Sequence, residues 1–228
     1  CPAWDVRGCI THVFGVEHML DGWMPDSLED PLPFDKVGEF AALMADKTTD
    51  ELVAECRRLA QARRQQIAEL DEDVWDAPSP TPVGPATYGR FLDIRVFDFW
   101  VHERDCRIPL NRPADSDAGP AAERSVEEVA MSIGYIAGKK IGLPDGKSLS
   151  FELTGPIERT INVAVDGRAK AVESLDDPDA TITSDSTTFV MLACGRIDPS
   201  EQIESGRISW TGDDALGDAA ARNLAFTM

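Results

Sequence analysis

The chain has 228 residues, which suits one large domain or two small ones with sizeable cores. Apolar residues make up 43 % of it and charged residues 28 %, as is typical of globular proteins. Its net charge of −19, from 41 acidic and 22 basic residues, repels phosphate backbones and so argues against a nucleic-acid partner.

The cysteines and the hydropathy pattern indicate the compartment. The chain has 5 cysteines, an odd number, with no Cys-x-x-Cys pair, which argues against a disulfide framework and for a reducing environment. No apolar run is long enough to span a bilayer, and no signal peptide is recognisable. We therefore expect a cytoplasmic monomer or homodimer that does not bind membranes.

The sequence pattern of the first part of the chain predicts helices and no strands. A Pro- and Asp-rich surface loop is expected over 21–36. Thr48 and Glu51 form a capping box that opens a long helix. The expected helices cover 5–20, 36–46 and 48–70. Four arginines are expected on the solvated face of the long helix: Arg57, Arg58, Arg63 and Arg64.

Prolines delimit the next helix. Residues 77–87 contain four prolines and cannot be helical, so a stiff connector is expected there. It leads into a largely apolar helix over Tyr88–Arg107, which ends near Pro109. Residues 109–119, rich in Pro, Asp and Gly, are expected to link two domains.

The pattern then changes from helices to a mixture of helices and strands. Helices are expected over 120–140, 185–194 and 213–226. Strands are expected over Ser148–Thr154, Thr160–Val165, Ala169–Glu173, Ala180–Thr183 and 207–211. Asp166 and Gly167 are typical of a hairpin turn. The prediction is an α+β protein with an all-α domain over 1–112 and an α+β domain over 119–228.

The helix over Tyr88–Arg107 carries an unusual polar stripe. Arg95, Asp98, His102 and Asp105 recur at steps of three and four, so they lie on one face. Polar groups on a helix that is otherwise so apolar must satisfy one another or hold a ligand. Asp98 and His102 are four residues apart, and a carboxylate and an imidazole at this spacing can bind one cation.

His12 on the first helix is the expected third ligand, because three protein ligands with an open position suit a catalytic divalent ion. His18 is the competing ligand, but it lies six residues from His12 and is expected to face the surface or a loop. The alternative is that Asp98 forms a buried ion pair with Arg95 and that His102 is an ordinary core histidine.

The sequence offers two further kinds of candidate site. No cysteine has an obvious base as its partner, so all are expected to be structural, Cys106 beside His102 included. Arg222 is a lone cation on a small apolar helix and is a candidate catalytic residue that binds an anionic substrate. The alternative for Arg222 is an ordinary surface salt bridge.

Four stretches together resemble the DinB-like, mycothiol-dependent maleylpyruvate isomerase family. They are Cys1–Arg7 with His12, Thr81–Pro85, Arg95–Arg107 and Asn223–Thr227. The resemblance implies a DinB-like four-helix bundle that carries a metal, followed by a small α+β domain similar to sterol carrier proteins. The family's first bundle helix is not recognisable, and we expect it to precede Cys1.

Carried over by position, the resemblance assigns His12, Asp98 and His102 as metal ligands, although the isomerases carry Glu where this chain has Asp98. Arg222 corresponds to a C-terminal arginine of the family. The implied function is that of a cytoplasmic enzyme with zinc, or nickel, iron or manganese, and mycothiol as its thiol cosubstrate. A metal-activated thiolate would isomerise a small electrophilic substrate or be transferred to it. The alternative is a non-catalytic protein that binds a metal or a small ligand.

Overall fold

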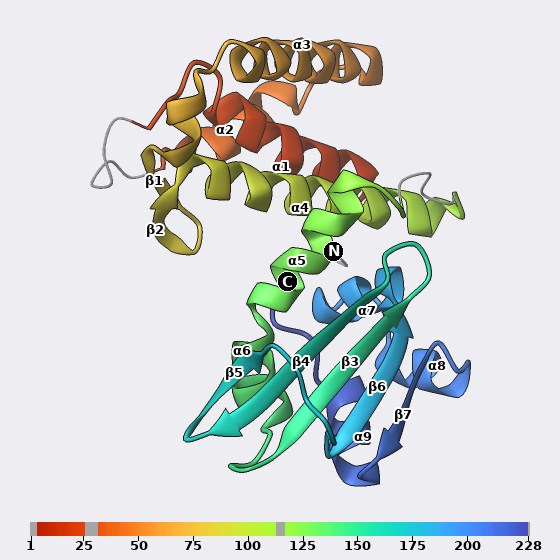
Figure 1. Ribbon diagram of the computed structural model, residues 1–228. Coiled ribbons are helices and arrows are strands. Elements are labelled where there is room, and N and C mark those ends of the chain that lie inside the picture. Colours follow the sequence, from red (N-terminus) through yellow and green to blue (C-terminus); the bar gives the residue numbers. More distant parts are fainter. Residues whose placement is uncertain (1–3, 26–31, 113–116, 228) are drawn as a thin grey trace. The chain divides into compact units, whose positions relative to one another are not determined.

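The computed structural model describes residues 4–25, 32–112 and 117–227. It divides the chain into two compact units, Cys1–Arg112 and Pro113–Met228 (Figure 1). The predicted domains, 1–112 and 119–228, differ from these units only by the linker. Parts of the expected linker, of the 21–36 loop and of the Cys1–Arg7 motif lie outside the described residues.

Two capped helices form the frame of the first unit. Helix α1 is Val6–Met19, and the Asp5 carboxylate accepts a hydrogen bond from its Gly8 N–H at 2.7 Å. Helix α4 is Tyr88–Arg107, the range that the sequence predicts, and Thr87 caps it in the same way. The two helices pack against one another, which brings their polar residues together.

Helices α2 (Asp35–Met44) and α3 (Thr49–Ala68) complete the helical part of this unit. The predicted capping box is confirmed, because Thr48 and Glu51 each bond the other's backbone N–H. Helix α2 approaches α1 closely at Gly15, where an added Cβ would lie 2.9 Å from the Val37 carbonyl oxygen. The buried core between α2 and α3 consists of Phe40, Leu52, Cys56 and Leu59.

The proline-rich segment, predicted as a stiff non-helical connector, is a β-hairpin, and its strands were not predicted. After the short helix η1 (Glu72–Asp76), strands β1 (Pro78–Thr81) and β2 (Gly84–Thr87) pair antiparallel. Prolines are tolerated here because the sheet has only two strands, and each strand has a free edge. The hairpin leads directly into α4, which the short helix η2 (Ile108–Leu110) follows.

The second unit begins with an interrupted helix where the sequence predicts a continuous one over 120–140. Helix α5 (Pro120–Met131) stops at Ser132, α6 (Ile133–Tyr135) follows, and η3 (Ile136–Ile141) is a π-helix. The helical segment passes close to a strand at Gly134, where an added Cβ would lie 2.9 Å from the Ala169 carbonyl oxygen.

A five-stranded sheet follows, in the order β5-β4-β3-β6-β7. Its strands are β3 (Ser148–Thr154), β4 (Arg159–Asp166), β5 (Arg168–Val172), β6 (Ala180–Asp185) and β7 (Ile208–Gly212). β3 and β6 pair parallel and the other neighbours pair antiparallel. Leu149, Phe151 and Leu153 of β3 are buried on one face, the period of two that a half-covered sheet requires.

Helices α7 (Ser186–Ala193) and α9 (Asp214–Arg222) pack against this sheet, and α8 (Pro199–Glu204) was not predicted. The Phe151 and Phe189 rings meet with centroids 5.6 Å apart. The predicted α+β class, with a helical first domain, is therefore confirmed. None of the helices in the described part of the chain has the length and apolar character needed to cross a bilayer.

Candidate metal centre

The structure brings together the three predicted metal ligands of the first unit. His12 comes from α1, and Asp98 and His102 come from α4. One nitrogen or oxygen of each side chain lies within 4.8 Å of the others. The two imidazole rings meet edge to face with centroids 5.2 Å apart. Side chains from two packed helices therefore converge as a set of two imidazoles and one carboxylate.

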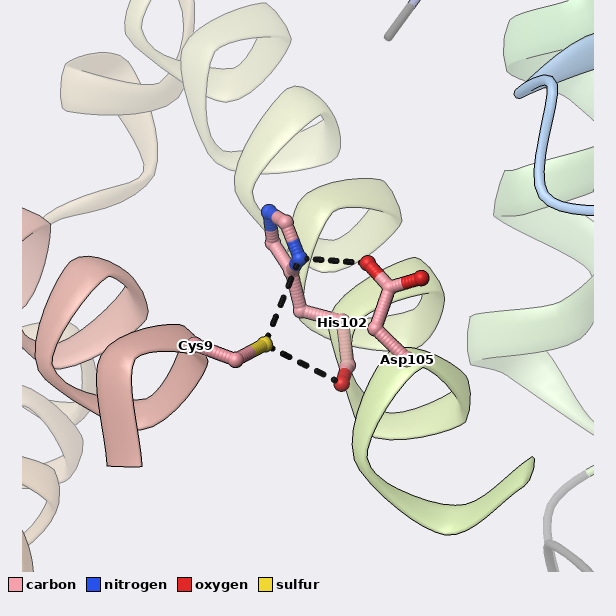
Figure 2. Close-up of side chains that lie close together, drawn as sticks. All are labelled: Cys9, His102 and Asp105. Atoms are coloured by element: carbon pink, nitrogen blue, oxygen red, sulfur yellow. Dashed lines mark hydrogen bonds and ion pairs between the residues drawn. The ribbon is translucent and has the colours of Figure 1, made fainter. Parts of the chain in front are cut away.

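The two ring nitrogens of His102 have different partners. Nδ1 lies 2.8 Å from Oδ2 of Asp105 (Figure 2), and Nε2 lies 3.4 Å from Oδ1 of Asp98. An ionised carboxylate only accepts hydrogen bonds, so Nδ1 carries a proton. Nε2 of the neutral ring then directs a lone pair at the Asp98 oxygen. The Nε2 lone pair and the Asp98 oxygen would repel one another unless a proton or a metal cation lay between them. With a metal there, Asp105, His102 and the cation would form a carboxylate–histidine–metal arrangement.

The pKa shifts show that the site attracts positive charge. Burial lowers the pKa of His102, but hydrogen bonds to Asp105 and Asp98 outweigh burial and raise it to about 11. Burial alone would raise the pKa of Asp98. The hydrogen bond with His102 and the charge of Arg95 lower this pKa by more than burial raises it, so the net shift is downward. A divalent cation at Nε2 would supply the positive charge that a proton otherwise brings, so these residues fit a metal.

His12 is suited to be a ligand for a different reason. Its side chain is half-buried, and burial lowers the pKa of its imidazole. The neutral form, which is the form that binds metals, is therefore favoured at neutral pH. The Trp4 ring lies against it, with centroids 4.6 Å apart. His18, the rejected ligand, packs against Phe40 instead of facing the surface as expected.

Arg95 fixes the carboxylate ligand from the other side. Its Nη1 donates to Oδ2 of Asp98 at 2.5 Å, and its Nη2 donates to Oε1 of Glu17 at 2.8 Å. The ion pair that the sequence suggested as an alternative therefore coexists with the ligand set, because it uses the other carboxylate oxygen. Glu17 also accepts from Nε of Arg63 at 3.1 Å. The expectation that Arg63 is solvated was wrong, since α1 places a buried carboxylate against it.

Cys9 is a neighbour of the site that the sequence did not reveal. The buried Cys9 Sγ lies 3.6 Å from Nδ1 of His102 and donates to the His102 carbonyl oxygen at 3.7 Å (Figure 2). Cys9, His102 and Asp105 form a second group with donor atoms within 4.8 Å. Nδ1 already donates to Asp105, so the first group is the better candidate. The sequence did hold one indication of this contact: Cys9 lies three residues before His12 and therefore shares its face of α1.

Two more predicted residues are not part of this centre. Burial, together with the nearby Cys9, raises the pKa of the Cys106 thiol to about 12, which disfavours a nucleophilic thiolate. Arg222 belongs to the second unit, where Nε pairs with Asp218 at 2.8 Å and Nη1 donates to Ser200 at 3.0 Å. Its catalytic role stays a prediction.

Each unit matches a domain model. The mycothiol maleylpyruvate isomerase N-terminal domain matches residues 1–107, and the MDMPI C-terminal domain matches residues 123–219. The chain belongs to the mycothiol maleylpyruvate isomerase family. The family resemblance that was inferred from the sequence motifs is thereby confirmed.

Solved structures of the family share this fold. The crystal structures of the mycothiol-dependent maleylpyruvate isomerase and of a mutant are 15 % and 17 % identical to this chain, with TM-scores of 0.51 and 0.53. Each alignment covers 90 % of this chain and 75 % of that chain. The sterol carrier protein domain 2 of Helicoverpa armigera is 16 % identical over 48 % of this chain and 98 % of its own, with a TM-score of 0.34. Comparison with curated proteins gave no significant match.

Proposed function

We propose that this protein is a metal-dependent enzyme that uses mycothiol as a thiol cosubstrate. Its substrate is a small electrophilic molecule, and its reaction is isomerisation or transfer of the thiol sulfur. The observation that carries the proposal is the orientation of His102, with Nδ1 held by Asp105 and Nε2 directed at Asp98. The names of the matching domains and of the solved enzymes support the choice of thiol.

His12, Asp98 and His102 would hold the metal. Two imidazoles and one carboxylate suit zinc, with nickel, iron or manganese as alternatives. When bound, the divalent cation supplies a positive charge that lowers the pKa of a thiol, so that a thiolate forms at neutral pH. Three protein ligands leave room in the coordination sphere for an exogenous group.

The surrounding residues keep this ligand set in one state. Asp105 accepts the hydrogen bond from Nδ1 of His102, so Nε2 is the nitrogen that would bind the metal in place of a proton. Arg95 holds one oxygen of Asp98 and leaves the other directed at His102. A largely apolar cavity of about 110 Å³ adjoins His102 and is lined by Val13, Phe14 and Phe99 among others.

Metal content tests the centre directly. We expect purified wild-type protein to contain a divalent metal, and His102→Ala to lose it, when both are measured by inductively coupled plasma mass spectrometry. His18→Ala is the matched control, because it removes a histidine that lies outside the ligand set. Circular dichroism checks that all three proteins are folded. If His102→Ala keeps as much metal as the wild type, the proposed centre is wrong.

Turnover then separates an enzyme from a non-catalytic binding protein. We expect mycothiol-dependent consumption of maleylpyruvate or of a bimane electrophile, and its loss after the metal is removed by a chelator. Arg222→Gln should retain the metal and turn over more slowly if Arg222 binds an anionic substrate. Metal binding without thiol-dependent turnover of any electrophile would favour the non-catalytic alternative.

A further inference from the structure

The second unit contains a groove that the metal centre does not use. It has a volume of about 830 Å³ and is lined by residues of α6, η3 and β5. Helix α6 lies beside β5, the edge strand of the sheet (Figure 1). Gly134, Gly138 and Ala169 are part of its lining, and because they lack large side chains the helical segment and the strand approach closely there. This volume is in the range of small-molecule sites.

The charges of the groove are unusual for so acidic a chain. Lys139, Arg168 and Lys170 line it, and within the described part of the chain no ion pair or hydrogen bond engages their side-chain charges. The acidic residue in the lining, Asp145, uses Oδ1 to accept from the Gly167 N–H at 2.8 Å. Three other cations of this unit form ion pairs with carboxylates, namely Lys147, Arg159 and Arg222. The lining therefore carries three cations against one carboxylate, a positive balance in an acidic chain.

The apolar part of the lining limits the kind of ligand further. Tyr135 and Met131 border the groove, and they are 54 % and 52 % exposed. Large apolar side chains that remain exposed beside a cavity favour a ligand with an apolar surface. The π-helix η3, which carries Lys139, is a rare form that is often found at functional sites.

Protection of the sheet edge is the simpler explanation of some of these charges. Charged side chains on an edge strand hinder pairing with other chains, and Arg168 and Lys170 lie on β5. Lys139 lies on η3, however, where it protects no edge. Edge protection also leaves the cavity and the exposed Tyr135 ring unexplained.

We propose that this groove binds a small organic anion in which a carboxylate or phosphate group is attached to a flat apolar body. The acid group pairs with Arg168, whose guanidinium offers two parallel donors, and with Lys139 and Lys170. The flat part of the ligand lies on Tyr135. This site is independent of the metal centre and of the proposed reaction.

Titration of the full chain with three probes tests the proposal. Benzoate and phenyl phosphate carry the two candidate acid groups, and benzamide is a neutral molecule of nearly the same shape as benzoate. We expect saturable amide shifts in nuclear magnetic resonance spectra over 131–143 and 165–171 with one or both anions. Benzamide should bind at least about fivefold more weakly, because it lacks the charge that the three cations recognise.

Two matched variants locate the site. Arg168→Gln should weaken binding of the anion by about fivefold or more, whereas Arg207→Gln, which removes an exposed charge outside the groove, should leave it unchanged. The proposal is overturned if neither anion gives saturable shifts, if benzamide binds equally well, or if both variants behave alike. A preference between benzoate and phenyl phosphate identifies the acid group.

Discussion

His102 shows how much of the site depends on one residue's hydrogen bonds. Its ring is buried, and each nitrogen faces a different carboxylate. In the proposed centre, Asp105 thereby fixes Nδ1 as the nitrogen that keeps its proton and Nε2 as the one that would bind the metal. The chemistry of the site is set by a group that would not itself touch the metal.

The role of Asp105 can be measured as metal affinity. Asp105→Asn removes the negative charge that holds the Nδ1 proton, and we expect it to weaken zinc binding by about tenfold or more. Competition with a chelating dye gives the affinity. Asp46→Asn is the control, because Asp46 is exposed in the same unit. Equal zinc affinity in Asp105→Asn and wild type would show that Asp105 does not position His102.

Residues on one helix were easier to predict than residues that meet across helices. The spacing of Asp98 and His102 follows from the helical period, and the structure does place them side by side. The contacts of Cys9, Glu17 and Arg63 depend on which faces of α1, α3 and α4 meet. The periodicity of a single helix does not indicate which face of another helix it meets, so these contacts were not predicted.

At the scale of elements, a single buried carboxylate joins three helices. Glu17 of α1 is 5 % exposed, and it accepts hydrogen bonds from Arg63 of α3 and Arg95 of α4. Arg95 in turn holds the Asp98 carboxylate. The packing of the helices and the orientation of a predicted ligand therefore depend on the same ion-pair network.

Glu17→Gln tests this network. It leaves two largely buried guanidinium groups without their counter-charge, so we expect the first unit to lose about 3 kcal/mol of unfolding free energy in urea. Glu55→Gln is the control, since it breaks the exposed Arg58 pair and should cost less than about 1 kcal/mol. Comparable losses in the two variants would mean that the Glu17 network is not a specific stabilising element.

Elements with strong local signals were predicted well, and those shaped by tertiary contacts were not. Capping residues and apolar periodicity located α1 and α3, and the flanking prolines delimited α4, each to within a few residues. The break at Ser132 and the π-helix after it lie where the helical segment must pass β5 at Gly134. Gly134 is visible in the sequence, but the sequence pattern does not indicate that β5 lies against it.

At the scale of the whole molecule, the two compact units have different proposed ligands. The residues that would hold a metal all belong to the first unit. A ligand stabilises the structure that binds it and leaves an uncoupled unit unchanged. We therefore expect a bound metal to stabilise the first unit and to leave the stability of the second unit unchanged.

Hydrogen–deuterium exchange measures this effect. After zinc is added to chelator-treated protein, we expect slower exchange in α1 and α4 and no change in β3, β4 and β6. His102→Ala with the same zinc concentration is the control, and its exchange should not change. Slower exchange throughout the chain would indicate non-specific binding of zinc or coupling between the units.

The position of Asp98 and His102 on one helix also restricts how this protein can change in length. A residue inserted between them would rotate one side chain by about 100° relative to the other and would separate the pair. Insertions and deletions between Asp98 and His102 should therefore abolish metal binding.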